Sequence, residues 1–128
     1  MKNAILIAAL VGCASPAFAK DSEAPRILHV KVERAPQGEP LEIRARITDD
    51  SEVFAPSVYA RPEGASESDN IEMKKVTDGY AATITAEQMT GPIEYFIEAF
   101  DEHGNGPARS GSPESPTKVS VFDPKTEP

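Results

Sequence analysis

The sequence predicts an all-β protein, built as a sandwich of seven short antiparallel strands that follow an export signal. Short runs of alternating apolar and polar residues recur about every ten residues between positions 27 and 122. The chain also contains 12 prolines and 8 glycines, which interrupt it too often for long helices. Its 128 residues are enough for one domain and a signal peptide.

Seven runs carry the strand pattern. They are Leu28–Val32, Leu41–Thr48, Val53–Arg61, Ile71–Thr77, Tyr80–Ala86, Ile93–Asp101 and Thr117–Phe122. Alternation is clearest in the second run, where Leu41, Ile43, Ala45 and Ile47 face one way and charged or polar residues face the other. That pattern is typical of a half-buried antiparallel strand. In the first run we expect Leu28, Val30 and Val32 to face the core.

One hairpin has its turn marked in the sequence. Asp78-Gly79 separates two of the runs, and such a pair favours a two-residue turn because both positions tolerate positive φ. A turn at Asp78 and Gly79 pairs Thr77 with Tyr80 and places Met73 opposite Ile84. The residues expected on its inner face are Met73, Tyr80, Ala82 and Ile84.

The strand count and spacing fit an immunoglobulin-like sandwich. The run from Gly38 to Asp49, with Ser51, Val53, Val58, Tyr59 and Arg61 after it, resembles bacterial immunoglobulin-like and fibronectin type III-like modules. So do Gly79-Tyr80-x-Ala82-x-Ile84 and the stretch from Gly91 to Asn105, and the resemblance covers residues 27–122. It implies that Tyr95 is a corner tyrosine whose hydroxyl bonds to backbone upstream of its strand. Unlike antibody domains, the chain has no tryptophan and no pair of cysteines.

The first 19 residues read as a signal peptide. Lys2 precedes an apolar stretch, Ala4 to Val11, and Ala17-Phe18-Ala19 is a small-x-small cleavage site. Residues 20–26 are then a linker, 27–122 the sandwich and 123–128 a C-terminal tail. Alternatively, Leu10-Val11-Gly12-Cys13 resembles a lipobox, which would make Cys13 a lipidated first residue on the outer membrane. Both interpretations place the domain outside the cytoplasm, secreted or periplasmic in the first case, and no other segment is apolar enough to cross a membrane.

Charge and cysteine content exclude several classes of function. A net charge of −8 argues against a nucleic-acid partner, which needs a basic surface. Cys13 is the one cysteine and lies inside the signal, so a disulfide within the chain is impossible.

Nothing in the pattern indicates catalysis. There is no Gly-x-Ser-x-Gly elbow, and the two histidines, His29 and His103, have no partner at metal-ligand spacing. We expect His29 to be a solvated strand position and His103 part of a turn. The chain is therefore not expected to be an enzyme, although a small hydrolase or inhibitor that uses the acidic loops is an alternative.

Aromatic residues define one candidate surface. With Ile93, Tyr95, Ile97 and Ala99 inward, alternate residues of that strand point outward. The predicted outer stripe consists of Tyr59, Phe96, Phe100 and Phe122. Such a stripe can stack on a sugar ring or dock a protein. The alternative is aromatic pairing across strands that stabilises the sheet.

Acidic loops define another candidate. The predicted topology brings three connections to one end of the sandwich, and these carry Asp49, Asp50, Asp101 and Asn105. Calcium prefers such oxygen ligands, but Asp and Asn also favour turns on their own. No cofactor other than this calcium alternative is expected.

These features predict a non-catalytic secreted or surface-exposed module of the bacterial cell envelope that binds a protein or a glycan. A calcium-stabilised adhesion unit is the nearest alternative.

Overall fold

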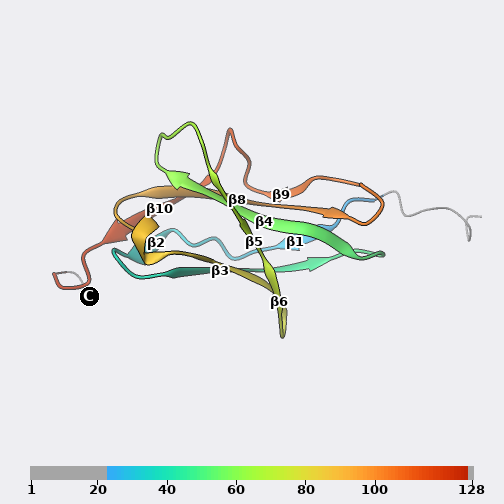
Figure 1. Cartoon of the computed structure of the whole chain (residues 1–128), viewed down its shortest axis with the longest axis horizontal. Coiled ribbons are helices and arrows are strands. Elements are labelled where there is room, and N and C mark those ends of the chain that lie inside the picture. Colours follow the sequence, from blue (N-terminus) through green and yellow to red (C-terminus); the bar gives the residue numbers. More distant parts are fainter. Residues whose placement is uncertain (1–22, 127–128) are drawn as a thin grey trace, which may run out of the picture.

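The computed structural model describes residues 23–126 and arranges them as two stacked β-sheets (Figure 1). The strands in this part are β1 (Arg26–Leu28), β2 (Arg34–Pro36), β3 (Leu41–Thr48), β4 (Val53–Pro62), β5 (Asp69–Glu72), β6 (Lys74–Val76), β7 (Gly79–Ile84), β8 (Ile93–Asp101), β9 (Ala108–Ser110) and β10 (Thr117–Phe122). A short 3-10 helix, η3 (Ala86–Gln88), joins β7 to β8. The predicted signal peptide, including Cys13, lies outside the described residues. Across residues 23–126, no helix has the length and apolar character needed to cross a membrane.

The smaller sheet contains four strands in the order β1-β3-β7-β6, all antiparallel. Its central pair, β3 and β7, sets Ile43 opposite Ala82 and Ala45 opposite Tyr80. At one edge, β1 is hydrogen-bonded to β3 only from Arg26 to Leu28. The chain then leaves this sheet and crosses toward the other one.

The larger sheet contains six strands. Five of them lie side by side in the order β2-β10-β8-β4-β5, and β9 also pairs with β8. Two short strands share one edge of β8, because β10 pairs with its first residues and β9 with residues 97–99. The pairing of β2 with β10 is parallel, and all others in this sheet are antiparallel.

The core lies between the sheets and is formed by the inward halves of alternating strands. Its largest fully buried apolar side chains are Ile43, Val58, Ile84, Met89, Tyr95, Ile97 and Val119. The expected inward residues of β3, β4 and β8 are buried or half-buried, so alternation gave the correct face in these strands. Three predicted ranges, 41–48, 93–101 and 117–122, agree with the observed strands at both ends.

Two predicted strands are wrong because in each the chain leaves one sheet for the other. In the first run, 28–32, Leu28 is the last residue of β1 and residues 29–32 belong to no strand; the chain pairs again at β2, in the other sheet. The run 71–77 is broken at buried Met73, whose backbone N–H donates to the carbonyl of Pro56 at 2.9 Å. Residues before Met73 pair with β4 and those after it with β7. These divisions and the unforeseen β9 explain why ten strands are described where seven were predicted.

The hairpin between β6 and β7 forms at the predicted place with a different register. Lys75 pairs with Tyr80 and Val76 with Gly79, whereas the prediction paired Thr77 with Tyr80. The turn therefore consists of Thr77 and Asp78. Because the register differs by two residues, every side chain of β7 keeps its predicted face.

Candidate functional site

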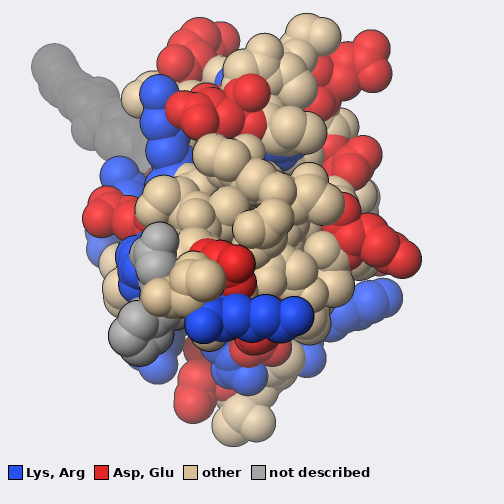
Figure 2. Space-filling model, turned by 90° about the vertical axis from the view of Figure 1, so that its left-hand side faces the viewer, with Lys and Arg blue, Asp and Glu red and all other residues tan. Residues whose placement is uncertain are grey.

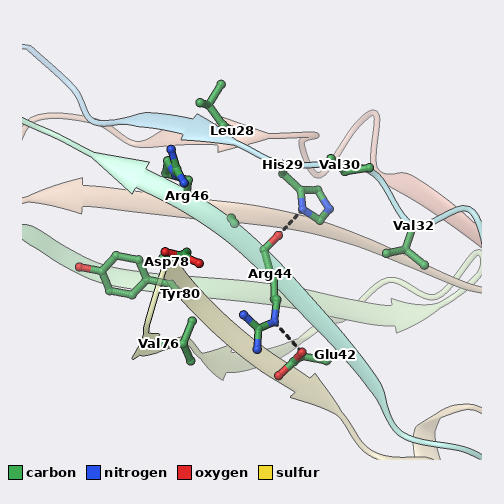
Figure 3. Close-up of a pocket in the computed structure, with 12 residues that line it drawn as sticks. Leu28, His29, Val30, Val32, Glu42, Arg44, Arg46, Val76, Asp78 and Tyr80 are labelled. Carbon is green, nitrogen blue, oxygen red and sulfur yellow. Dashed lines mark hydrogen bonds and ion pairs between the residues drawn. The ribbon is translucent and has the colours of Figure 1, made fainter.

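A hollow of about 370 Å³ lies on the outer face of the four-stranded sheet (Figure 3). Three parts of the chain line it: residues 26–33, which comprise β1 and the residues up to β2 and are called the first segment below, then β3, and the β6–β7 hairpin. The lining residues are Leu28, His29, Val30, Val32, Glu42, Arg44, Ala45, Arg46, Val76, Asp78, Gly79 and Tyr80. The term "the hollow" below refers to this set.

One cross-strand row that lines the hollow includes a glycine. Leu28 lies opposite Arg46, and Gly79 lies opposite Val76 on the neighbouring pair of strands. Residues opposite each other in antiparallel strands share a face, and Gly79 adds no side chain to this row. A Cβ on Gly79 would lie 2.4 Å from the carbonyl oxygen of Ala45. The close approach of β7 to β3 therefore requires glycine here.

The wall formed by the first segment is apolar and open to solvent. Leu28 is 67% exposed and Val30 is 88% exposed. Both were predicted to face the core, and that prediction is wrong. In the observed register Ile27 faces inward opposite Ile47, which turns Leu28 outward.

Charged side chains of both signs form the rest of the rim. The Nε of Arg44 donates to the Oε1 of Glu42 at 2.7 Å, and this exposed hydrogen bond raises the pKa of Arg44. Arg46 and Asp78 are exposed on the other side of the hollow. The rim can thus offer an ionic partner to either sign of charge, beside an aliphatic wall.

His29 is not the solvated residue that the sequence predicted. It is half-buried, with its Nδ1 2.6 Å from the carbonyl oxygen of Arg44 and its Nε2 2.6 Å from the hydroxyl of Tyr95. The same hydroxyl accepts the backbone N–H of Val32 at 3.0 Å. Tyr95 therefore bonds to backbone upstream of its strand, but 63 residues upstream in the first segment.

The predicted aromatic stripe is only partly assembled. Tyr59 and Phe96 stack with ring centroids 4.9 Å apart. Phe100 lies at the far end of β8 opposite Phe54. Phe122 is beyond the other end of β8, opposite Pro36 and under the guanidinium of Arg34 at 4.0 Å.

Phe96 itself is covered and is only 7% exposed. Residues 107–116, called the strap below, fold over it from β9 to the start of β10. Arg109 of the strap bonds Glu98 at 2.8 Å and lies 5.9 Å from the centre of the Phe96 ring, while Gly111 approaches the Phe96 backbone. The expectation of an open stripe is therefore wrong at Phe96.

A partly buried ion pair fastens the strap. The Nε of Arg61 donates to the Oε1 of Glu94 at 2.8 Å, and its Nη2 donates to the carbonyl of Pro113 at 3.0 Å. Hydrogen bonding from Arg61 is the main reason that the pKa of Glu94 lies below its ordinary value. The bond to Pro113 connects this pair directly to the strap.

Carboxylates at the acidic end bond within their own loops. The buried Asp101 accepts backbone N–H groups of His103 and Asn105 at 2.9 Å and the side-chain amide of Asn105 at 2.8 Å. Asp49 accepts the backbone N–H and hydroxyl of Ser51. Within residues 23–126, no group of three or more His, Cys, Asp and Glu side chains is placed to hold a metal ion. The calcium site remains a prediction.

Sequence reasoning missed the hollow and the exposed aromatic Phe54, which is 61% exposed. The sequence contains one indication of the hollow. Ile27 and Leu28 are both apolar, so either can face the core, and the other is then an exposed apolar residue.

Comparison with known proteins adds no identification. No protein-family model matches the chain, and no curated protein matches it.

Proposed function

We propose that the chain is an exported immunoglobulin-like module, without catalytic activity, that binds a protein partner of the bacterial cell envelope through the hollow. The observation that carries this proposal is the exposure of Leu28 and Val30 on the wall of a concave surface. Exposed apolar side chains that adjoin one another, surrounded by polar residues, mark interaction sites.

Strand order supports the immunoglobulin-like part of the proposal. Such domains place strands A, B, E and D in one sheet and C, F and G in the other. The order β1-β3-β7-β6 corresponds to A-B-E-D, and β10-β8-β4 corresponds to G-F-C. The extra parallel pairing of β2 with β10 extends the second sheet.

The chemistry of the hollow favours an extended protein segment over a sugar. An aliphatic side chain of the partner fits against Leu28 and Val30, and flanking charged groups can pair with Arg46 or Asp78. Stacking on a sugar ring needs an open aromatic face, and the exposed wall formed by Leu28 and Val30 is aliphatic. Phe96, the aromatic residue predicted to provide that face, is covered by the strap.

Surface charge agrees with a protein partner. Figure 2 shows the end of the molecule that lies on the left in Figure 1, where acidic and basic side chains surround an area that carries neither. With a net charge of −8 and both signs interspersed, the chain lacks the basic character that a polyanion requires.

A capture experiment tests the proposal. Purified wild-type protein, the double variant Leu28→Ser with Val30→Ser, and the control Phe54→Ser are immobilised and exposed to cell-envelope extract. Phe54 is also an exposed apolar residue but lies on the other sheet. We expect proteins retained by wild type and by Phe54→Ser to be lost from the double variant. Equal retention by all three proteins would refute the hollow as the binding surface.

A further inference from the structure

The first segment is held to the core by one chain of hydrogen bonds centred on the Tyr95 hydroxyl. Val32 donates its backbone N–H to this oxygen at 3.0 Å, and Nε2 of His29 lies 2.6 Å from it. Tyr95 is fully buried, and the His29 ring meets it edge-on with centroids 5.6 Å apart. Two residues that line the hollow, His29 and Val32, are therefore fastened to the same buried oxygen.

The bonding pattern fixes the tautomer of His29. The carbonyl oxygen of Arg44 can only accept, so Nδ1, 2.6 Å away, must carry a hydrogen. In a neutral imidazole Nε2 is then the acceptor, and it receives the hydroxyl hydrogen of Tyr95. In this state each donor in the series of hydrogen bonds has an acceptor, from Val32 through Tyr95 and His29 to Arg44.

One additional proton breaks this arrangement. When Nε2 is protonated it becomes a donor, and both it and the N–H of Val32 point at the Tyr95 oxygen. The hydroxyl hydrogen then loses His29 as its acceptor, inside a buried site where an unpaired polar group is costly. Leaving the core restores solvent to the charged ring.

Burial and the charge of Lys31 also disfavour the protonated form of His29. Burial is the main cause that lowers the pKa of His29, the Arg44 carbonyl raises it, and Lys31 on the same segment lowers it further. The titratable and charged groups around the ring and its partner Tyr95 are Lys31 and Glu33 on its own segment, Glu42, Arg44 and Arg46 on β3, Asp78 and Tyr80 on the hairpin, and Tyr95 on β8. Of these, Glu42 bonds Arg44 rather than the ring.

We propose that a proton on His29 releases residues 29–32 from Tyr95 and thereby opens one wall of the hollow. The segment is a pH-sensitive latch: closed when the imidazole is neutral and open when it is charged. The latch follows from the fold alone, whereas its effect on partner binding rests on the proposed function. Acidification would then weaken the interaction by moving Val30 and Val32 away from the other walls.

Hydrogen exchange of the Val32 amide tests the latch directly, because that N–H is one of its bonds. Exchange is measured on the full chain at pH 7.5 and 5.5 and corrected for the intrinsic pH dependence of exchange. An open segment has an imidazole of ordinary pKa, about 6.5, so acidification should lower Val32 protection by up to about tenfold. In His29→Gln the corrected protection should not change with pH, while His103→Gln should behave as wild type.

A measurement on wild type alone covers the case in which His29→Gln does not fold. The ring signals of His29 and His103 are followed by NMR over the same pH range. Val32 protection should begin to fall near pH 6.5, the ordinary imidazole pKa of the open segment, while the ring signal of His29 stays that of the neutral form to lower pH, because the closed segment disfavours the proton. A Val32 amide whose protection is unchanged at pH 5.5, or a His29 ring that becomes charged while Val32 stays protected, would overturn the latch.

The latch and the proposed function can fail separately. If Val32 protection does not respond to pH but Leu28→Ser with Val30→Ser loses its partner, the latch is refuted and the binding surface stands. If protection responds but wild type retains the partner equally at pH 7.5 and 5.5, control of binding by the latch is refuted.

Discussion

At the scale of single residues, the burial of the Thr117 side chain costs free energy of folding. Its hydroxyl oxygen is buried on β10 and has no hydrogen-bond partner within residues 23–126. Burying such a group without a partner costs about 1–3 kcal/mol in proteins. Thr117→Val has nearly the same shape and removes this cost, so we expect stabilisation of about 1 kcal/mol in urea unfolding. The exposed Thr83→Val should change little, and a destabilised Thr117→Val would show that the hydroxyl is satisfied.

Ala55 is strained by its backbone conformation. It has φ of 54° at the bulge where the register of β4 on β8 shifts between Phe54 and Ser57. For residues other than glycine this left-handed region costs about 1–2 kcal/mol. Since glycine also loses more entropy on folding, Ala55→Gly should stabilise the protein by up to about 1 kcal/mol. Ala60→Gly, on the same strand without such strain, should destabilise it in the same urea experiment.

At the scale of elements, substitutions in the first segment test the observed register, in which Ile27 faces the core and Leu28 faces outward. Val30→Ser should change the free energy of unfolding by less than about 0.5 kcal/mol, because Val30 is 88% exposed. Ile27→Ala should cost about 1–2 kcal/mol, because Ile27 packs against the core. If alternation through Leu28, Val30 and Val32 were correct, the order of the two costs would reverse.

The inward prediction for Leu28 and Val30 failed because the segment changes sheets. Alternation of apolar and polar residues indicates the buried face only while a segment stays in one sheet. This segment leaves the four-stranded sheet after Leu28 and pairs with β10 from Arg34. Ile27 and Leu28 supply an apolar residue for either register. Tyr95, which holds His29 inward, is 66 residues away in the sequence, so no local pattern indicates it.

The strap depends on the Arg61–Glu94 pair, whose side chains are 18% and 8% exposed. Arg61→Met should destabilise the protein at pH 7 by about 1.5–3 kcal/mol, the usual range for hydrogen bonds to charged groups. Because Arg61 lowers the pKa of Glu94, the folded state binds this proton less readily than the unfolded state. The contribution is complete above the ordinary Glu range and is lost as pH falls through the folded pKa.

Urea unfolding at pH 7 and pH 3 therefore separates this pair from general packing. The difference between wild type and Arg61→Met should shrink at pH 3. The exposed Arg44→Met should have little effect at either pH. A difference that is constant with pH would assign the role of Arg61 to packing alone.

At the scale of the whole molecule, the all-β class and most strands follow from sequence because both sheets have one face on a shared core. Leu41–Thr48 and Ile93–Asp101 show this, since their alternation matches the observed burial on the core side. The outer faces are less predictable. Phe96 alternates outward as expected, yet the polar strap that covers it is held by Arg61 and Arg109, long-range contacts that no periodicity encodes.

Site-specific photocrosslinking tests the recognition surface most directly. A photoreactive side chain is placed at position 30 or 46, on two walls of the hollow, or at control positions 54 or 109 on the other sheet. Each protein is irradiated in cell-envelope extract and its adducts are identified by mass. We expect one partner to crosslink from positions 30 and 46 and not from 54 or 109. Adducts only from positions 54 and 109 would contradict recognition through the four-stranded sheet.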